Sequence, residues 1–276
     1  MPDGLDPLYA RSGCLHPVSS PEGRIVTAMF PDDHAHQHGI FRHGPARHGT
    51  GGKWTSGTGS RHQPSASRKG RVSRSDRQWS PLRSRSAAPG DTGTSHRRSA
   101  RERWTISTVP TDGTWHCFDL ASVQTAMTTH PLVLEKYLYG GMAFRGPVEW
   151  LTESDSDSKN SRINRQPCEI FNDHGSDRIE GNHQHCRWVC LSGQQAEGTV
   201  SVTVMCHSEN LRAPQAVRIH PTKPYFVFAP CVDDPFEITQ LQPYAARYRY
   251  IITDSRPEPE WLNQQWNAWH SRPRDR

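Results

Sequence analysis

Between residues 32 and 38 the chain reads Asp-Asp-His-Ala-His-Gln-His. In an extended segment alternate side chains share one face, so the three imidazoles would lie together beside two carboxylates. Imidazole is a common general acid or base and a common metal ligand. We therefore expect His34, His36 and Asp33 to move a proton at a hydroxyl group, such as that of a sugar, or to hold a divalent metal ion. A polar surface strand is the alternative.

A second candidate site follows residues 199–206, where polar and apolar residues alternate as in a half-buried strand. His207 comes directly after this strand, and Asn210 lies three residues further on. Loops that a rigid scaffold holds in place often carry function, which makes His207 a candidate proton-transfer residue. The alternative is a turn residue that bonds its own backbone.

Seven cysteines, an odd number without regular spacing, do not indicate a disulfide framework. The run 183–190, His-Gln-His-Cys-Arg-Trp-Val-Cys, contains residue types that bind zinc. Its C-x-x-x-C spacing is not that of a zinc knuckle, and buried strand thiols are the preferred interpretation.

The elements that must position these residues are predominantly β. Residues 225–229 and 246–252 are rich in aromatic and β-branched side chains, and Pro and Gly recur at short intervals between such segments. This pattern predicts an antiparallel β-sandwich or barrel. Residues 258–269 place Trp261, Leu262, Trp266 and Trp269 at helical spacing, which predicts one C-terminal helix docked through these side chains.

Residues 42–103 differ in composition from both flanks. They contain 15 Lys or Arg against three acids and only four large apolar residues, so they cannot build a core. The segment carries a formal +12 in a chain of net +5, which leaves −7 for the remainder. Three interpretations remain: a disordered basic arm that binds nucleic acid, a solvated linker, or a segment read out of frame.

The genetic code is compatible with the third interpretation. With codons that start at the third base of the printed ones, residues 53–61 can encode Val-Asp-Phe-Trp-Asn-Arg-Glu-Gln, and residues 42–49 can encode Ala-Trp-Ala-Arg-Thr-Ala-Trp. That composition suits folded strands. We expect a frameshift, and nucleic-acid binding only if the printed segment is genuine.

Three parts of the chain follow from this division. Residues 1–41 are the N-terminal part of a β-domain, 42–103 the basic segment, and 104–276 the main part of the same domain. No apolar run is long enough for a membrane helix, and the start lacks the features of a signal peptide, although it reads as truncated. We expect a soluble protein. Walker, dinucleotide-binding and serine-hydrolase motifs are absent from the sequence.

Four blocks of the chain resemble a known family. Residues 9–41 resemble its block HP…G…FP-x-DHPHHRGI, residues 139–146 its YGG-x-x-FR block, residues 206–214 its HPxNxRxP block, and residues 247–249 its RYR strand. This is the PmoA-like family, widely labelled "methane oxygenase PmoA" and better described as a domain of unknown function. Its members tend to carry an Asp-Phe-Trp segment after the His block, as the shifted frame would restore. Ala35, Gln37 and His38 depart from its Pro, His and Arg.

The resemblance adds Arg145, Asn210 and Tyr139 as substrate-binding candidates beside the catalytic candidates Asp33, His34, His36 and His207. Methane oxidation is not supported, because the membrane subunit of that name spans the bilayer. The resemblance and the β-rich flanks imply a sandwich of the mutarotase type with carbohydrate-related binding or processing, an analogy of fold. Whether the chain is an enzyme stays open, as does activity of the printed form.

Overall fold

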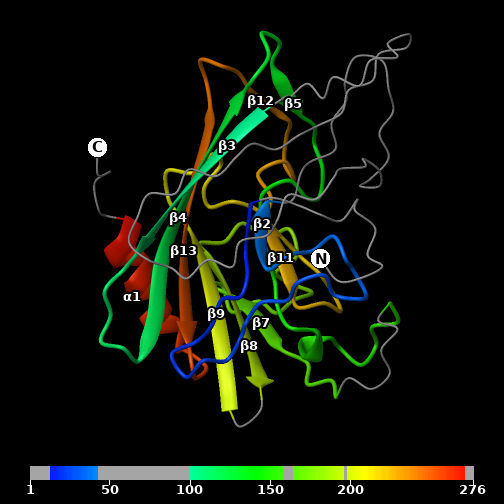
Figure 1. The fold of residues 1–276 in the computed structure, drawn as a ribbon, viewed down its shortest axis with the longest axis vertical. Helices are drawn as coiled ribbons and strands as arrows, with labels where there is room; N and C mark the ends of the chain where they lie inside the picture. Colours follow the sequence, from blue (N-terminus) through cyan, green and yellow to red (C-terminus); the bar gives the residue numbers. More distant parts are fainter. Residues whose placement is uncertain (1–12, 43–99, 158–163, 196–197, 271–276) are drawn as a thin grey trace.

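The computed structural model describes residues 13–42, 100–157, 164–195 and 198–270. These residues form three antiparallel sheets and one α-helix (Figure 1). The predicted all-β class, with a single C-terminal helix among the described residues, is confirmed. Most of segment 42–103 lies outside them, but its two ends do not: Arg42 and residues 100–103 belong to strands.

The larger sheet has six strands in the order β3-β4-β13-β9-β8-β7. Its strands are β3 (Ala100–Thr108), β4 (Trp115–Ala126), β13 (Tyr244–Thr253), β9 (Gly198–Cys206), β8 (Trp188–Gln195) and β7 (Glu169–Asn172). The strands predicted at 199–206 and 246–252 are its central pair, β9 and β13. Both have neighbours on each side, which suits their β-branched and aromatic content.

The second sheet has five strands in the order β1-β2-β6-β11-β10. Its strands are β1 (Cys14–Leu15), β2 (Ile40–Arg42), β6 (Met142–Arg145), β11 (Tyr225–Phe228) and β10 (Val217–Ile219). A separate pair joins β5 (Leu132–Leu134) to β12 (Phe236–Ile238), and a short 3₁₀ helix, η2, covers Val148–Trp150. Strands from before and after the basic segment, β2 and β6, pair in this sheet.

The core lies between the two large sheets and follows from the period-two alternation of their strands. Val202 and Val204 of β9 meet Phe226 and Phe228 of β11 there, all essentially inaccessible to solvent. Within the five-stranded sheet, Gly141, just before β6, allows close approach to the backbone of β11: a Cβ atom at this position would lie 1.7 Å from the carbonyl oxygen of Phe228. The two layers therefore form the predicted sandwich.

The helix α1 (Pro259–His270) covers the outer face of the six-stranded sheet, on the side of β4 and β13 away from β2 and β11 (Figure 1). Leu262 and Trp269 are buried against Trp188 and Met205, and Trp261 and Trp266 pack partly against the same cluster. The expectation that these tryptophans dock a helix is confirmed. All seven cysteines are free thiols, six of them buried.

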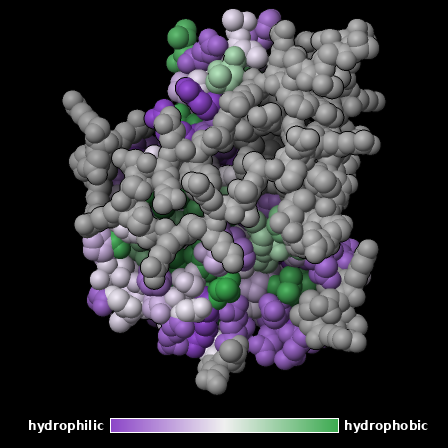
Figure 2. All heavy atoms as spheres, in the orientation of Figure 1, coloured by the Kyte–Doolittle hydropathy of each residue, from purple (hydrophilic) through white to green (hydrophobic). Residues whose placement is uncertain are grey.

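Hydrophilic side chains predominate where the described surface is visible in Figure 2, and hydrophobic ones form separate small groups. The most exposed large apolar residues, Leu241 and Ile179, lie in turns at different places in the chain. Isolated exposures of this kind are normal for a folded domain.

Within the described ranges, none of the helices has both the length and the apolar character needed to cross a membrane.

Candidate functional site

A compact loop carries the Asp-His run to the rim of the five-stranded sheet. An isolated bridge joins Met29 to His38, and the amide of Gln37 donates to the carbonyl of His34 at 2.9 Å. The alternation expected of an extended segment is therefore wrong: this stretch is a pair of turns closed on itself. The loop directs Asp33 inward and leaves His34 partly exposed.

Arg145, the last residue of β6, holds Asp33 through two parallel hydrogen bonds of 2.9 and 2.7 Å. The same guanidinium donates to the side-chain oxygen of Gln37 at 2.8 Å. Both charged side chains of the pair are fully buried. Such a bidentate arrangement fixes geometry as well as charge, so Arg145 sets the position of the whole loop.

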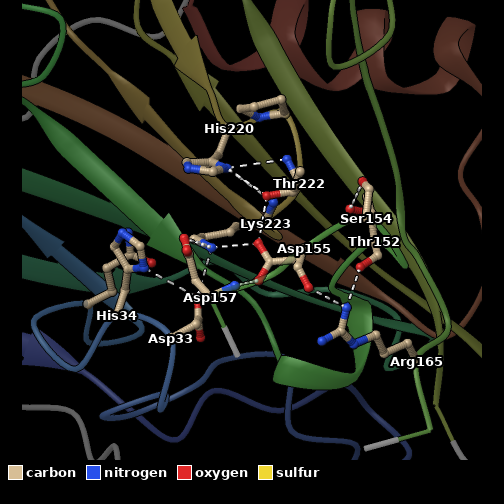
Figure 3. Close-up of polar contacts among 12 residues, drawn as sticks. Asp33, His34, Thr152, Ser154, Asp155, Asp157, Arg165, His220, Thr222 and Lys223 are labelled. Atoms are coloured by element: carbon tan, nitrogen blue, oxygen red, sulfur yellow. Dashed lines mark hydrogen bonds and ion pairs between the residues drawn. The ribbon is translucent and has the colours of Figure 1, made fainter. Parts of the chain in front are cut away.

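Lys223 extends the ion pair into a network (Figure 3). Its fully buried ammonium lies 2.5 Å from Asp155, 3.0 Å from Asp157 and 3.5 Å from Asp33. Thr222 donates a further hydrogen bond of 2.6 Å to Asp155. Buried charges persist only when they are paired in this way, and here Arg145 and Lys223 are both neutralised by carboxylates.

The backbone of segment 152–157 is held by a second arginine. Arg165 donates to the carbonyl oxygens of Thr152 and Asp155 at 2.9 and 2.7 Å. The amide of Asp157 donates to the other side-chain oxygen of Asp155. The acids that face Lys223 therefore sit on a loop whose shape is fixed from behind.

Three imidazoles border the network. The ring centroid of His34 lies 5.1 Å from that of His36 and 6.2 Å from that of His220. His220 follows β10, and its amide continues the pairing with β11 through the carbonyl of Tyr225. Figure 3 places His34 and His220 on one side of the network and Arg165 on the other.

The surroundings of Asp33 keep its carboxylate charged. Burial by itself would raise the pKa of Asp33, but the neighbouring ring of His34 and the charge of Arg145 hold this pKa well below its usual range. The Nδ1 atom of His34 lies 3.6 Å from the Asp33 carboxylate, which favours a proton on Nδ1. The lone pair of His34 is then on Nε2, where it can accept a proton.

In His220 the ring proton is on the other nitrogen, Nε2. Its Nδ1 accepts hydrogen bonds from the amides of Thr222 and Lys223 at 3.2 and 3.3 Å, so the proton of the neutral ring resides on Nε2. Burial, with the nearby charges of Lys223 and Arg218, lowers the pKa of His220 to about 4. His34, beside the Asp33 carboxylate, and a neutral hydrogen-bond donor at His220 thus border the same network.

Tyr139 belongs to the same side of the five-stranded sheet. Its ring lies 6.2 Å from that of Tyr225, and Tyr225 is the register partner of Arg145. The structure therefore brings together five of the sequence-predicted residues: Asp33, His34, His36, Arg145 and Tyr139.

His207 and Asn210 are in a different place, at the end of β9 and beneath α1. The ring of His207 packs edge-on against Trp269 with centroids 4.8 Å apart, and its Nδ1 accepts hydrogen bonds from Arg247 and from the amide of Glu209. Burial lowers the pKa of His207 to about 4. Placing His207 with His34 in one catalytic site does not fit this arrangement, because the six-stranded sheet separates α1 from the core.

Asn210 uses its amide to extend the ladder of β13. Its side-chain oxygen accepts from the amide of Arg247 at 2.8 Å, and its side-chain nitrogen donates to the carbonyl of the same residue at 2.8 Å. Both polar atoms are therefore engaged with one backbone unit. The Asn210 side chain therefore joins two parts of the backbone and is not directed at a substrate.

Sequence reasoning missed His220, Lys223 and Asp155. The available sequence signal was the pair Pro221 and Pro224, which marks a turn after a strand. In the part of the chain that the structure describes, no group of three or more His, Cys, Asp or Glu side chains has an arrangement that could hold a metal ion.

Comparisons with known proteins give one match. The model of a family described as "Family of unknown function (DUF6807)" matches residues 1–267. No curated protein and no solved structure matches the chain.

Proposed function

We propose that this chain, which belongs to the family of unknown function DUF6807, binds a carbohydrate at the rim of its five-stranded sheet and moves a proton at one of the sugar oxygens. The proposal retains Asp33, His34 and Arg145 from the sequence-based hypothesis and replaces His207 with His220. Tyr139 and His36 would line the same site.

One observation carries the proposal: the ring of His34 lies beside the buried carboxylate of Asp33 and 6.2 Å from the ring of His220, whose Nδ1 accepts two backbone hydrogen bonds. A base and a hydrogen-bond donor on either side of a reacting oxygen are the requirement of general acid–base chemistry. Because Arg145 and Lys223 are already paired with carboxylates, their role is to hold Asp33 and the loop of His34 in place.

The simplest balanced reaction for this pair is exchange of a sugar between its ring forms. His34 would take the proton of the anomeric hydroxyl while the bond from the anomeric carbon to the ring oxygen breaks. The N–H of His220 would stabilise the charge that develops on the ring oxygen, and the proton held by His34 would then pass to that oxygen. Reclosure on the other face of the carbonyl completes the exchange without a co-reactant.

Polarimetry with a panel of freshly dissolved aldoses tests the proposal on the full 276-residue chain. We expect faster approach to anomeric equilibrium, and a rate about 100-fold or more lower in His34→Gln and in His220→Gln, since a positioned proton-transfer group contributes at least that much. His130→Gln, at an exposed histidine, is the matched control and should retain the rate. If no aldose is accelerated and calorimetry detects no sugar binding, the proposal is wrong.

A further inference from the structure

Arg218 projects from the outer face of the same sheet. Its neighbours in β10, Val217 and Ile219, are buried in the core, so alternation places Arg218 on the opposite side. Its register partner in β11 is Val227, which packs in the cluster on that outer face. His220 lies two residues beyond and therefore follows Arg218 on the same face.

The charge of Arg218 is not matched by a carboxylate in the described residues, whereas that of Arg145 is. Its Nη1 donates to the side-chain oxygen of Asn182 at 2.9 Å and to the carbonyl of Ile219. Among the described side chains, its Nε is the buried arginine nitrogen that has no hydrogen-bond acceptor. A buried donor without an acceptor costs free energy, and a bound ligand that supplies the acceptor would remove this cost.

Among the described residues, the surroundings of Arg218 add no carboxylate partner. The guanidinium lies over the ring of Tyr139, 5.8 Å from its centroid. His183 and His220 are neutral neighbours: burial, with the charge of Arg218, lowers the pKa of His183, and burial, with the charges of Lys223 and Arg218, lowers the pKa of His220 to about 4. The Nε2 atom of His183 is also buried without a partner.

We infer that Arg218 forms a carboxylate subsite, beside the proton-transfer pair, that selects sugar acids over neutral sugars. The sugar part of the ligand rests on the proposed function, whereas the binding of a carboxylate by Arg218 does not. One unmatched positive charge suits a carboxylate, which carries one negative charge, better than a phosphate dianion. The planar fork of arginine also matches a carboxylate in two hydrogen bonds, as Arg145 already does with Asp33.

The position of the subsite fits one sugar ring. Residues two apart on a strand are separated by roughly 7 Å, so a carboxylate on Arg218 would place the opposite end of a hexuronate near His220. The ring of His34 lies beyond, 6.2 Å from that of His220. Tyr139, under the guanidinium, would contact the sugar from the side.

Calorimetric titration of the full chain with glucuronate and with glucose tests the preference. We expect glucuronate to bind about 10- to 100-fold more tightly, the range of a charge-assisted hydrogen bond. Arg218→Gln should bring glucuronate to the level of glucose and leave glucose within about twofold, while Arg218→Lys should restore part of the preference. Equal affinities in the unmutated chain, or a preference that persists in Arg218→Gln, overturn the subsite while the proposed function stands.

A second titration separates the subsite from the sugar. Acetate carries the carboxylate alone, and we expect it to shift the NMR signals of the His220 ring in the unmutated chain and not in Arg218→Gln. If acetate gives this result but no sugar binds, the proposed function fails and the anion subsite stands. If acetate shifts the His220 signals equally in both proteins, or in neither, the subsite is wrong. Circular dichroism of both variants establishes that the fold is retained.

Discussion

Asp33 and Arg145 lie 112 positions apart in the sequence and join through two hydrogen bonds, with both side chains inaccessible to solvent. The pair connects the loop of the histidine run to the end of β6. It explains why a polar loop at the rim of a sheet has a defined shape, because a buried carboxylate and a buried guanidinium can only be retained together.

Loss of this pair should destabilise the protein strongly. Asp33→Asn keeps the shape of the side chain but leaves Arg145 buried without its counter-charge, and we expect a decrease of about 3–5 kcal/mol in the free energy of unfolding. Glu169→Gln makes the same chemical change in an exposed pair with Arg256 and should cost no more than about 1 kcal/mol. Urea denaturation compares the two, and equal losses would contradict the role assigned to Asp33.

The two histidines of low pKa predict an acid-labile fold. The pKa of His207 and of His220 is lowered to about 4 in the folded chain, from an ordinary 6.5, mainly by burial. Between these values the unfolded chain binds protons that the folded chain does not, so stability should fall as the pH decreases from about 6.5 to 4. The pKa of Asp33 is lowered from 3.8, so protonation of Asp33 reduces the stability of the fold only below this pH range.

Unfolding free energies measured at pH 7 and pH 5 check this sign. The double variant His207→Gln, His220→Gln should lose less stability over this interval than the unmutated chain, because the two groups with the largest lowering of pKa among the described histidines are removed. An unchanged pH dependence in the double variant would show that other groups control it.

Asn210 should act on stability and not on ligand binding. Asn210→Ala removes both hydrogen bonds to the backbone of Arg247, and we expect a loss of about 1–3 kcal/mol in the free energy of unfolding. Sugar affinity, measured by calorimetry at a temperature where the variant is folded, should remain within about twofold. A large loss of affinity with unchanged stability would restore Asn210 as a substrate-binding residue.

The basic segment is flanked on both sides by residues that belong to strands. Arg42 of β2 pairs with Met142 of β6, and Ala100 of β3 pairs with Ala126 of β4. Both flanks of the basic segment therefore take part in the sheets. We predict that resequencing the DNA will find one compensated shift between the codons of residues 43 and 99, restoring Asp-Phe-Trp. A printed frame confirmed by resequencing would instead favour polyanion binding by the basic segment, which salt-dependent DNA affinity would test.

Local pattern was sufficient to predict β9, β11, β13 and α1, because period-two alternation and helical spacing are properties of short segments. It could not predict which strands pair. The neighbours of β6 are β2 and β11, which lie about 100 and 80 residues away, and only the packed core selects them.

The residues of the candidate site that stand in a local sequence pattern could be predicted, and the others could not. Asp33 and His34 stand in a conspicuous run, and Arg145 in a block that resembles a family motif. Lys223 and Asp155 have no local pattern: each is an ordinary charged residue until the fold buries them 2.5 Å apart. His207 was assigned by its position after a strand, a criterion that is blind to which side of the sheet the turn faces.

NMR of the histidine side chains of the full chain, recorded during a titration with glucuronate, tests directly whether His34 and His220 share one ligand site. We predict that the signals of His34 and His220 shift together with one dissociation constant, while those of His207, beneath α1, do not move. Shifts at His207 alone, or no shift at His34 and His220 at saturating sugar, would contradict it.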